Sequence, residues 1–163
     1  DILISDYKAN SRKIYVIPHG VPEKTLKKPK NALIKKPFYK LIRNKKVILY
    51  FGYLVKRKGL EYLIEAFELI SKKYSNYVLI LAGGTLKGYE EYVHKLKHMV
   101  KSKGLSDKVI FTGFVTEEEL AELFNIAEFV VLPAIYSISA SGPLSQAIGS
   151  HKPVISTNIG VMK

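Results

Sequence analysis

The sequence contains no cysteine among its 163 residues, which excludes disulfides, thiol catalysis and cysteine-ligated metal sites. It has no run of about twenty apolar residues and no signal-peptide pattern. These absences favour a soluble, cytoplasmic protein. Apolar residues make up 47% of the chain, enough for a core of ordinary size, so we expect a single domain over residues 1–163.

Acidic residues are scarce in the first 46 residues, which carry thirteen Lys or Arg against three Asp or Glu. Most of the basic residues fall within 24–46, and Pro29 and Pro37 interrupt any long helix there. We interpret residues 22–46 as a basic surface loop. Clustered lysines also attract phosphate groups, so the alternative is peripheral contact through residues 24–46 with a polyanion or with the inner face of a membrane.

Two aromatic residues in this basic loop, Phe38 and Tyr39, have two interpretations. Aromatic side chains among lysines can stack on nucleic-acid bases. A loop of this length in a compact domain also needs anchors, and we expect Phe38 and Tyr39 to pack against the body of the protein.

Short apolar runs rich in β-branched residues recur along the chain and do not alternate with polar residues, as in strands that are buried on both faces. The runs are Ile14–Ile17, Val47–Phe51, Val78–Ala82, Val109–Phe111, Phe129–Leu132 and Val154–Ser156. Stripes of apolar residues at helical spacing separate them, within 60–70, 92–100 and 120–127. Thr116 and Glu119 form a capping-box pattern before the third stripe. This order predicts an α/β fold: a Rossmann-like open parallel sheet with helices on both faces.

The segment VILYFGYLVKRKGLEYLIEAFELI, residues 47–70, has the clearest functional pattern. A buried strand ends at Gly52, the basic residues Lys56, Arg57 and Lys58 follow, and a helix begins near Gly59. The free amides of a helix N-terminus and nearby cations favour a bound anion. The segment therefore predicts a phosphate site, and the alternative is a solvated basic turn between a strand and a helix.

Six motifs in this order resemble those of one family. They are VIPHGV at 16–21, FGYLVKRKGLEYLIEAF at 51–67, LILAGG at 79–84, VIFTGFV at 109–115, AEFVVLPA at 127–134 and HKPVISTNIG at 151–160. Together they resemble the C-terminal, donor-binding domain of GT-B glycosyltransferases of family 4, glycosyl transferases group 1, which includes glycogen and sucrose-phosphate synthases. The resemblance implies one half of a GT-B fold that binds a nucleotide-sugar and needs no metal cofactor.

The resemblance also implies where the donor lies. The residues assigned to the donor and its phosphates are Gly52, Tyr53, Arg57, Lys58 and Gly83. The residues assigned to the nucleotide are Thr112, Gly113, Phe114, Ser141, Gly142, Leu144 and Gln146. Loop glycines let the backbone approach a ligand closely, although an ordinary tight turn explains each glycine equally well.

Three positions depart from the family pattern. Tyr53 stands where the family usually has arginine, and its single hydroxyl cannot replace two parallel guanidinium donors. The family places two glutamates eight positions apart; here Gln146 falls at the second position, and the first falls at or near Ile138, in a segment about one residue longer than usual. No Asp or Glu follows Glu128, so we assign no catalytic residue.

These departures leave two functions open. The first is the donor half of an enzyme that transfers hexosyl groups, in which an N-terminal acceptor half, or another chain, completes the active site. The resemblance implies that the chain is short at both ends, so we expect it to be inactive alone. The second is a catalytically decayed domain that serves as an interaction module or polyanion binder.

Two further patterns have ordinary explanations. His94 and His98 have the spacing of a zinc pair, but no cysteine or third histidine lies nearby in the sequence, and we expect solvated histidines. The serines at 137, 139, 141 and 145 lack the Gly-x-Ser-x-Gly pattern of a nucleophile, and we interpret this segment as a polar ligand loop.

Overall fold

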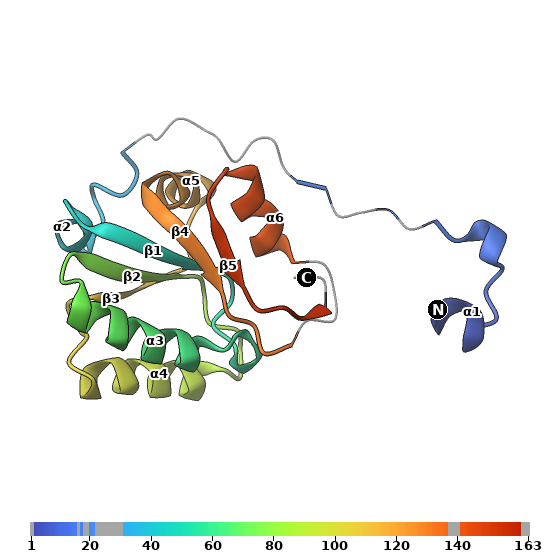
Figure 1. The fold of residues 1–163 in the computed structure, drawn as a ribbon, viewed down its shortest axis with the longest axis horizontal. Helices are drawn as coiled ribbons and strands as arrows, with labels where there is room; N and C mark the ends of the chain where they lie inside the picture. The colour runs from blue at the N-terminus through green and yellow to red at the C-terminus, as the bar shows by residue number, and fades with distance from the viewer. Residues whose placement is uncertain (1, 16, 18–19, 22–30, 137–140, 161–163) are drawn as a thin grey trace.

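A single sheet of five parallel strands forms the centre of the molecule in the computed structural model (Figure 1), which describes residues 2–15, 17, 20–21, 31–136 and 141–160. The strand order is β3-β2-β1-β4-β5. The strands are β1 (Lys46–Phe51), β2 (Tyr77–Ala82), β3 (Val109–Gly113), β4 (Ala127–Leu132) and β5 (Val154–Ser156). The open parallel sheet predicted from the sequence is therefore confirmed.

Strands β1 and β2 are buried on both faces, which explains their unbroken apolar sequences. Val47, Ile48, Leu49 and Tyr50 of β1 are each 1% exposed or less. β1 pairs with β2 in register from Lys46 opposite Tyr77 to Phe51 opposite Ala82. Because all five strands run parallel, their carboxyl ends meet at one edge of the sheet, where ligands of such folds bind.

Helices cover both faces of this sheet, as predicted. Figure 1 shows α3 (Leu60–Lys73) and α4 (Glu90–Ser102) on one face, and α5 (Glu117–Ile126) and α6 (Gly142–Gly149) on the other. Tyr50, Phe67 and Phe124 are the largest fully buried side chains, so the core extends through both layers.

Side-chain caps fix where α5 and α6 begin. The Thr116 hydroxyl accepts a hydrogen bond from the Glu119 amide, and the Glu119 carboxylate accepts one from the Thr116 amide, which confirms the predicted capping box. Ser141 caps α6, a short helix that the apolar pattern did not reveal.

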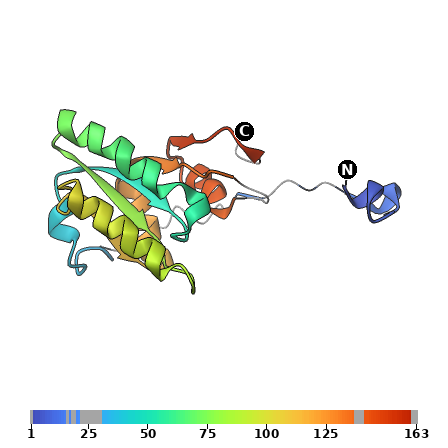
Figure 2. The same ribbon diagram turned by 90° about the horizontal axis from the view of Figure 1, so that it is seen from below.

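The strand predicted over Ile14–Ile17 is wrong for the residues that the structure describes. Ile14, Tyr15 and Ile17 are not in a strand, and Tyr15 and Ile17 are 81% and 83% exposed; Val16 lies outside the described residues. A strand needs a hydrogen-bonding neighbour, and the five-stranded sheet forms without this run. The nearby α1 (Ile2–Ser5) and η1 (Ser11–Lys13) contain no buried residue and lie away from the sheet (Figures 1 and 2).

The described part of the basic loop, residues 31–46, consists of turns and a short helix, α2 (Tyr39–Ile42), and ends in Lys46, the first residue of β1. Residues 22–30 lie outside the described residues. Phe38 and Tyr39 pack half-buried against the core, which confirms their anchoring role. Leu33 and Ile42 are buried more deeply, at 1% and 5% exposure, and are anchors that the sequence analysis missed.

Polar contacts also hold this segment in place. The Leu33 amide donates to the Glu122 carboxylate at 3.1 Å, and Lys36 pairs with Glu119 at 2.5 Å. Both acidic partners lie on α5, so the segment is attached to that helix. Within the described ranges, no helix is both long and apolar enough to cross a membrane.

Candidate functional site

A cleft of about 430 Å³ opens at the carboxyl edge of the sheet. It lies among the ends of β1, β2 and β3 and the N-terminus of α6. Nine of the twelve residues predicted to bind the donor line it: Gly52, Tyr53, Arg57, Lys58, Gly83, Phe114, Ser141, Gly142 and Gln146. Segments that are distant in the sequence therefore line the same cleft.

The floor of the cleft contains two glycines at the ends of neighbouring strands. The Gly52 amide donates to the Ala82 carbonyl at 3.0 Å, and the Gly83 amide donates to the Gly113 carbonyl at 3.1 Å. A β-carbon on Gly83 would stand 2.0 Å from the Gly52 carbonyl oxygen. Only glycine lets these two strand ends pass so closely, so the glycine at position 83 is required by the backbone.

Three contacts hold the loop after β1, residues 53–58, in place. The Tyr50 hydroxyl donates to the Tyr53 carbonyl at 2.9 Å, and the Ile135 amide donates to the Arg57 carbonyl at 2.9 Å. Gly59 ends the loop in the left-handed region at φ +66°, where a β-carbon would stand 2.2 Å from the Pro133 carbonyl oxygen. The position of Lys58 is thus set by the backbone on both sides.

The ammonium group of Lys58 is partly desolvated. Its side chain is half-buried, and burial together with the neighbouring Arg57 charge lowers its pKa below the usual value of 10.5. Burial raises the pKa of Tyr50 beneath the loop, so that phenol stays neutral. An anion in the cleft would offset the unfavourable environment of the Lys58 ammonium group.

The N-terminus of α6 forms the wall of the cleft opposite residues 53–58. The Ser141 hydroxyl accepts from the Leu144 amide at 3.3 Å, and Gly142, Pro143 and Gln146 face the cleft. The Gln146 Oε1 atom is buried and has no hydrogen-bond partner among the described residues. An unpaired buried acceptor in a cleft wall is suited to a ligand that donates a hydrogen bond.

Three of the predicted residues lie outside the cleft lining. The Thr112 hydroxyl donates to the Gly113 carbonyl at 2.8 Å, and that carbonyl also accepts from Gly83. Leu144 packs against the core, and its amide is used by Ser141. The roles predicted for Thr112, Gly113 and Leu144 as nucleotide contacts stay predictions.

The cleft also contains residues outside the twelve predicted donor contacts. Seven of these complete the lining: Phe51, Gly84, Val115, Thr116, Glu117, Leu120 and Pro143. Glu117, in the first turn of α5, is the acidic residue among them. The capping box marked the start of α5, and a search for acidic residues at that helix N-terminus would have found Glu117.

The other predicted features fall elsewhere or outside the described residues. His94 and His98 are exposed on α4, and no group of three or more His, Cys, Asp or Glu in the described ranges is arranged to hold a metal. Ile138, at or near the position of the first family glutamate, lies outside the described residues, as do Ser137 and Ser139.

The fold and the cleft define an open α/β domain whose ligand site lies at the carboxyl edge of a parallel sheet. The sequence profile of the family described as "Glycosyl transferases group 1" matches residues 33–163, and the chain belongs to this family. The predicted family resemblance is confirmed.

Solved structures show the same fold. The structure of Alr3699/HepE from Anabaena in complex with UDP has a TM-score of 0.78 and 23% identity, and covers 94% of this chain and 41% of that one. The C-terminal domain of LpcC, a glycosyl transferase group 1 protein from Francisella tularensis, has a TM-score of 0.69 and 24% identity over 84% of this chain and 70% of that one. The fold is therefore that of the C-terminal half of a GT-B glycosyltransferase.

Characterised and uncharacterised relatives match by sequence. The mannosylfructose-phosphate synthase of Agrobacterium fabrum is 31% identical over 160 residues, which cover 96% of this chain and 35% of that protein. The uncharacterised glycosyltransferase MJ1607 of Methanocaldococcus jannaschii is 31% identical over 117 residues, covering 72% of this chain and 28% of that protein. The chain thus spans about a third of the length of these relatives.

Proposed function

We propose that this domain binds a nucleotide-sugar in the cleft and serves as the donor half of a glycosyltransferase. The observation that carries the proposal is the convergence of nine predicted donor contacts on one cleft at the carboxyl edge of the sheet. The related fold of HepE has been solved with UDP and with UDP-glucose, which supports the same class of ligand here.

In this proposal the diphosphate lies between the loop after β1, residues 53–58, and the N-terminus of α6. Lys58 and Arg57 supply positive charge, and the backbone at Gly52 and Gly83 allows close approach. The helix dipole of α6 adds a partial positive charge from the other wall, although Pro143 has no amide and the Leu144 amide is bonded to Ser141. Among the lining residues Arg57 and Lys58 are basic and Glu117 is acidic, so the formal charge of the lining is positive and suits an anion.

The nucleoside lies beside α6 and the end of β3. The unpaired Gln146 Oε1 accepts a hydrogen bond from a ribose hydroxyl. Phe114, 78% exposed at the cleft, offers a ring on which a base can stack. Thr112 and Gly113 directly precede Phe114 in the chain, and in this proposal their backbone groups, not their side chains, contact the base.

Hexosyl transfer requires a second half that carries the acceptor. The chain spans about a third of its relatives, and we assign no catalytic residue within it. We propose that the chain alone binds the donor without transferring the sugar, and that an N-terminal half or another chain completes the enzyme.

Calorimetry with UDP, GDP, ADP and their sugars tests this proposal. We expect one nucleotide series to bind, and Lys58→Met to weaken binding by roughly tenfold or more, the contribution of one charge-assisted contact. Lys56→Met is the matched control, because Lys56 lies in the same turn, η3 (Lys56–Lys58), but does not line the cleft. Equal losses in both variants, or no binding at millimolar ligand, would refute the assignment.

Tyr53 and Gln146 favour a second candidate function, a decayed donor domain that acts as an interaction module. Tyr53 lines the cleft and is 54% exposed, where the family usually has arginine. If the cleft is a donor site, Tyr53→Arg adds a forked phosphate donor and raises nucleotide affinity, roughly ten- to a hundredfold. Unchanged affinity would favour the interaction module.

A further inference from the structure

The segment that leads into β1 at the amino edge of the sheet is strongly basic. Residues 31–46 contain six Lys or Arg and no Asp or Glu. Lys36 pairs with Glu119 and Lys46 with Glu128 at 3.6 Å. No ion pair joins Lys35, Lys40, Arg43 or Lys45 to an acidic residue in the described ranges, and all four are exposed.

Two apolar side chains are exposed among these charges. Ile34 is 49% exposed and Leu41 is 41% exposed, next to Lys35 and Lys40 in the sequence. Each sits beside a buried anchor: Leu33 precedes Ile34 and Ile42 follows Leu41. We define the amino-edge surface as Ile34, Lys35, Lys40, Leu41, Arg43 and Lys45.

We propose that the amino-edge surface binds an anionic lipid membrane. Clusters of four or more Lys or Arg are attracted to acidic headgroups, and exposed apolar side chains between them enter the boundary between headgroups and acyl chains. Nucleic acid would use the same cations but would gain little from Ile34 and Leu41. The apolar pair is therefore what favours a membrane over a nucleic acid.

The segment is already ordered before it meets a membrane. Leu33 and Ile42 are buried in the core, and the Leu33 amide is bonded to Glu122. The turns between them are closed by backbone hydrogen bonds, including Leu41 to Phe38 at 2.9 Å and Arg43 to Tyr39 at 3.1 Å. Binding thus requires little further ordering of the backbone, which removes an entropic penalty.

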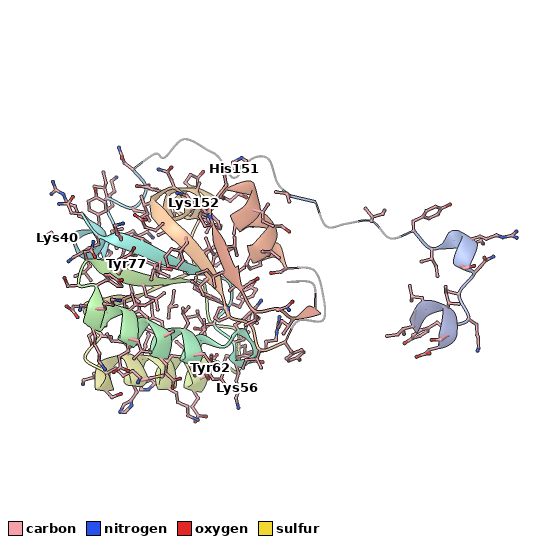
Figure 3. All side chains as sticks on the ribbon, viewed as in Figure 1. Lys40, Lys56, Tyr62, Tyr77, His151 and Lys152 are labelled. Carbon is pink, nitrogen blue, oxygen red and sulfur yellow. The ribbon has the colours of Figure 1, made fainter. Side chains whose placement is uncertain are left out.

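The orientation also leaves the cleft accessible. Figure 3 shows Lys40 at the amino end of the sheet and Lys56, in the loop after β1, at the other end. A membrane held at the Lys40 end does not cover the carboxyl edge, so a water-soluble donor still reaches the cleft.

Co-sedimentation of the full chain with lipid vesicles tests the proposal. We expect binding to phosphatidylcholine vesicles that contain about 30% phosphatidylglycerol, no binding to pure phosphatidylcholine, and weaker binding in about 0.5 M NaCl. Lys40→Gln/Arg43→Gln should lower the vesicle partition coefficient roughly 30-fold, at about 1 kcal/mol per basic residue. The control Lys56→Gln/Lys87→Gln removes two exposed charges at the other edge and should change the partition coefficient less than about twofold.

A second pair of variants separates a membrane from a nucleic acid. Leu41→Ser should weaken vesicle binding on the order of fivefold, while Leu69→Ser, which removes a 70% exposed leucine on α3, should not. Equal binding by the wild type and Lys40→Gln/Arg43→Gln, or binding to duplex RNA without binding to vesicles, would overturn the proposal. Nucleotide calorimetry on the same variants should be unchanged, so this test is independent of the donor site.

Discussion

A β-carbon at Gly83 would lie 2.0 Å from the carbonyl oxygen of Gly52, so the backbone at the end of β2 nearly touches the backbone at the end of β1. This contact shapes the floor of the cleft. It also makes Gly83 a structural requirement of the fold, whatever ligand the cleft holds.

Gly83→Ala is therefore expected to destabilise the domain strongly. The clash involves backbone on both sides and cannot be relieved by a side-chain rotation, so we expect a loss of about 3 kcal/mol or more in the free energy of unfolding, measured with urea. Gly88→Ala is the control, because Gly88 has φ +87° but no atom within 4 Å of its would-be β-carbon. That variant should lose only about 1 to 2 kcal/mol, and equal losses would contradict the close contact.

Lys58→Met should have opposite effects on binding and on stability. The folded protein holds the Lys58 ammonium in an unfavourable place, which is why its pKa is lowered. At neutral pH the charged form therefore weakens the fold, and removing the charge should raise the urea midpoint while weakening nucleotide binding. Lys56→Met should leave both measurements close to wild type, and a lowered midpoint for Lys58→Met would argue against the buried charge.

Nucleotide affinity should fall in alkaline solution because the protonated form of Lys58 is the one that binds phosphate. Its pKa in the free protein lies below 10.5, so the decline should begin at a lower pH than for an ordinary lysine. Lys58→Arg keeps its charge to about pH 12 and should move the decline upward. A pH profile identical for the two proteins would exclude titration of Lys58 as the cause.

Leu33→Ala should show that the basic segment is part of the folded body. Leu33 is 1% exposed, and truncating a fully buried leucine leaves a cavity and costs about 2 to 5 kcal/mol. Its neighbour Ile34 is 49% exposed, so Ile34→Ala should cost less than about 1 kcal/mol. Urea unfolding of the two variants gives the comparison, and equal effects would mean that the segment is not anchored as described.

Much of the fold was predictable because its signals are local. Unbroken apolar runs such as Val47–Phe51 identify strands buried on both faces, and the Thr116–Glu119 capping box marks a helix start without tertiary information. The run at Ile14–Ile17 is similarly apolar, but its described residues, Ile14, Tyr15 and Ile17, are not in a strand, because strand formation also needs a pairing partner, which no local pattern reveals. Helix α6 was missed because its short, mostly small residues give no clear apolar stripe.

The site was predictable to the extent that strand ends bring their loops together. Gly52, Lys58 and Gly83 follow neighbouring strands, so their convergence followed from the sheet topology. The packing of Leu144 against the core and the position of Glu117 in the cleft lining depend on how α5 and α6 are placed. Such placement is decided by packing between elements and is not encoded in any one motif.

The most direct test of the donor site is a titration of the isotopically labelled chain with UDP, GDP and ADP, followed by the backbone amide resonances. The account predicts that one nucleotide shifts the amides of Gly52, Lys58, Gly83 and Gly142 together, with the resonances of α4 unchanged. Shifts confined to α4 or to residues 31–46, or no shift at millimolar nucleotide, would contradict it.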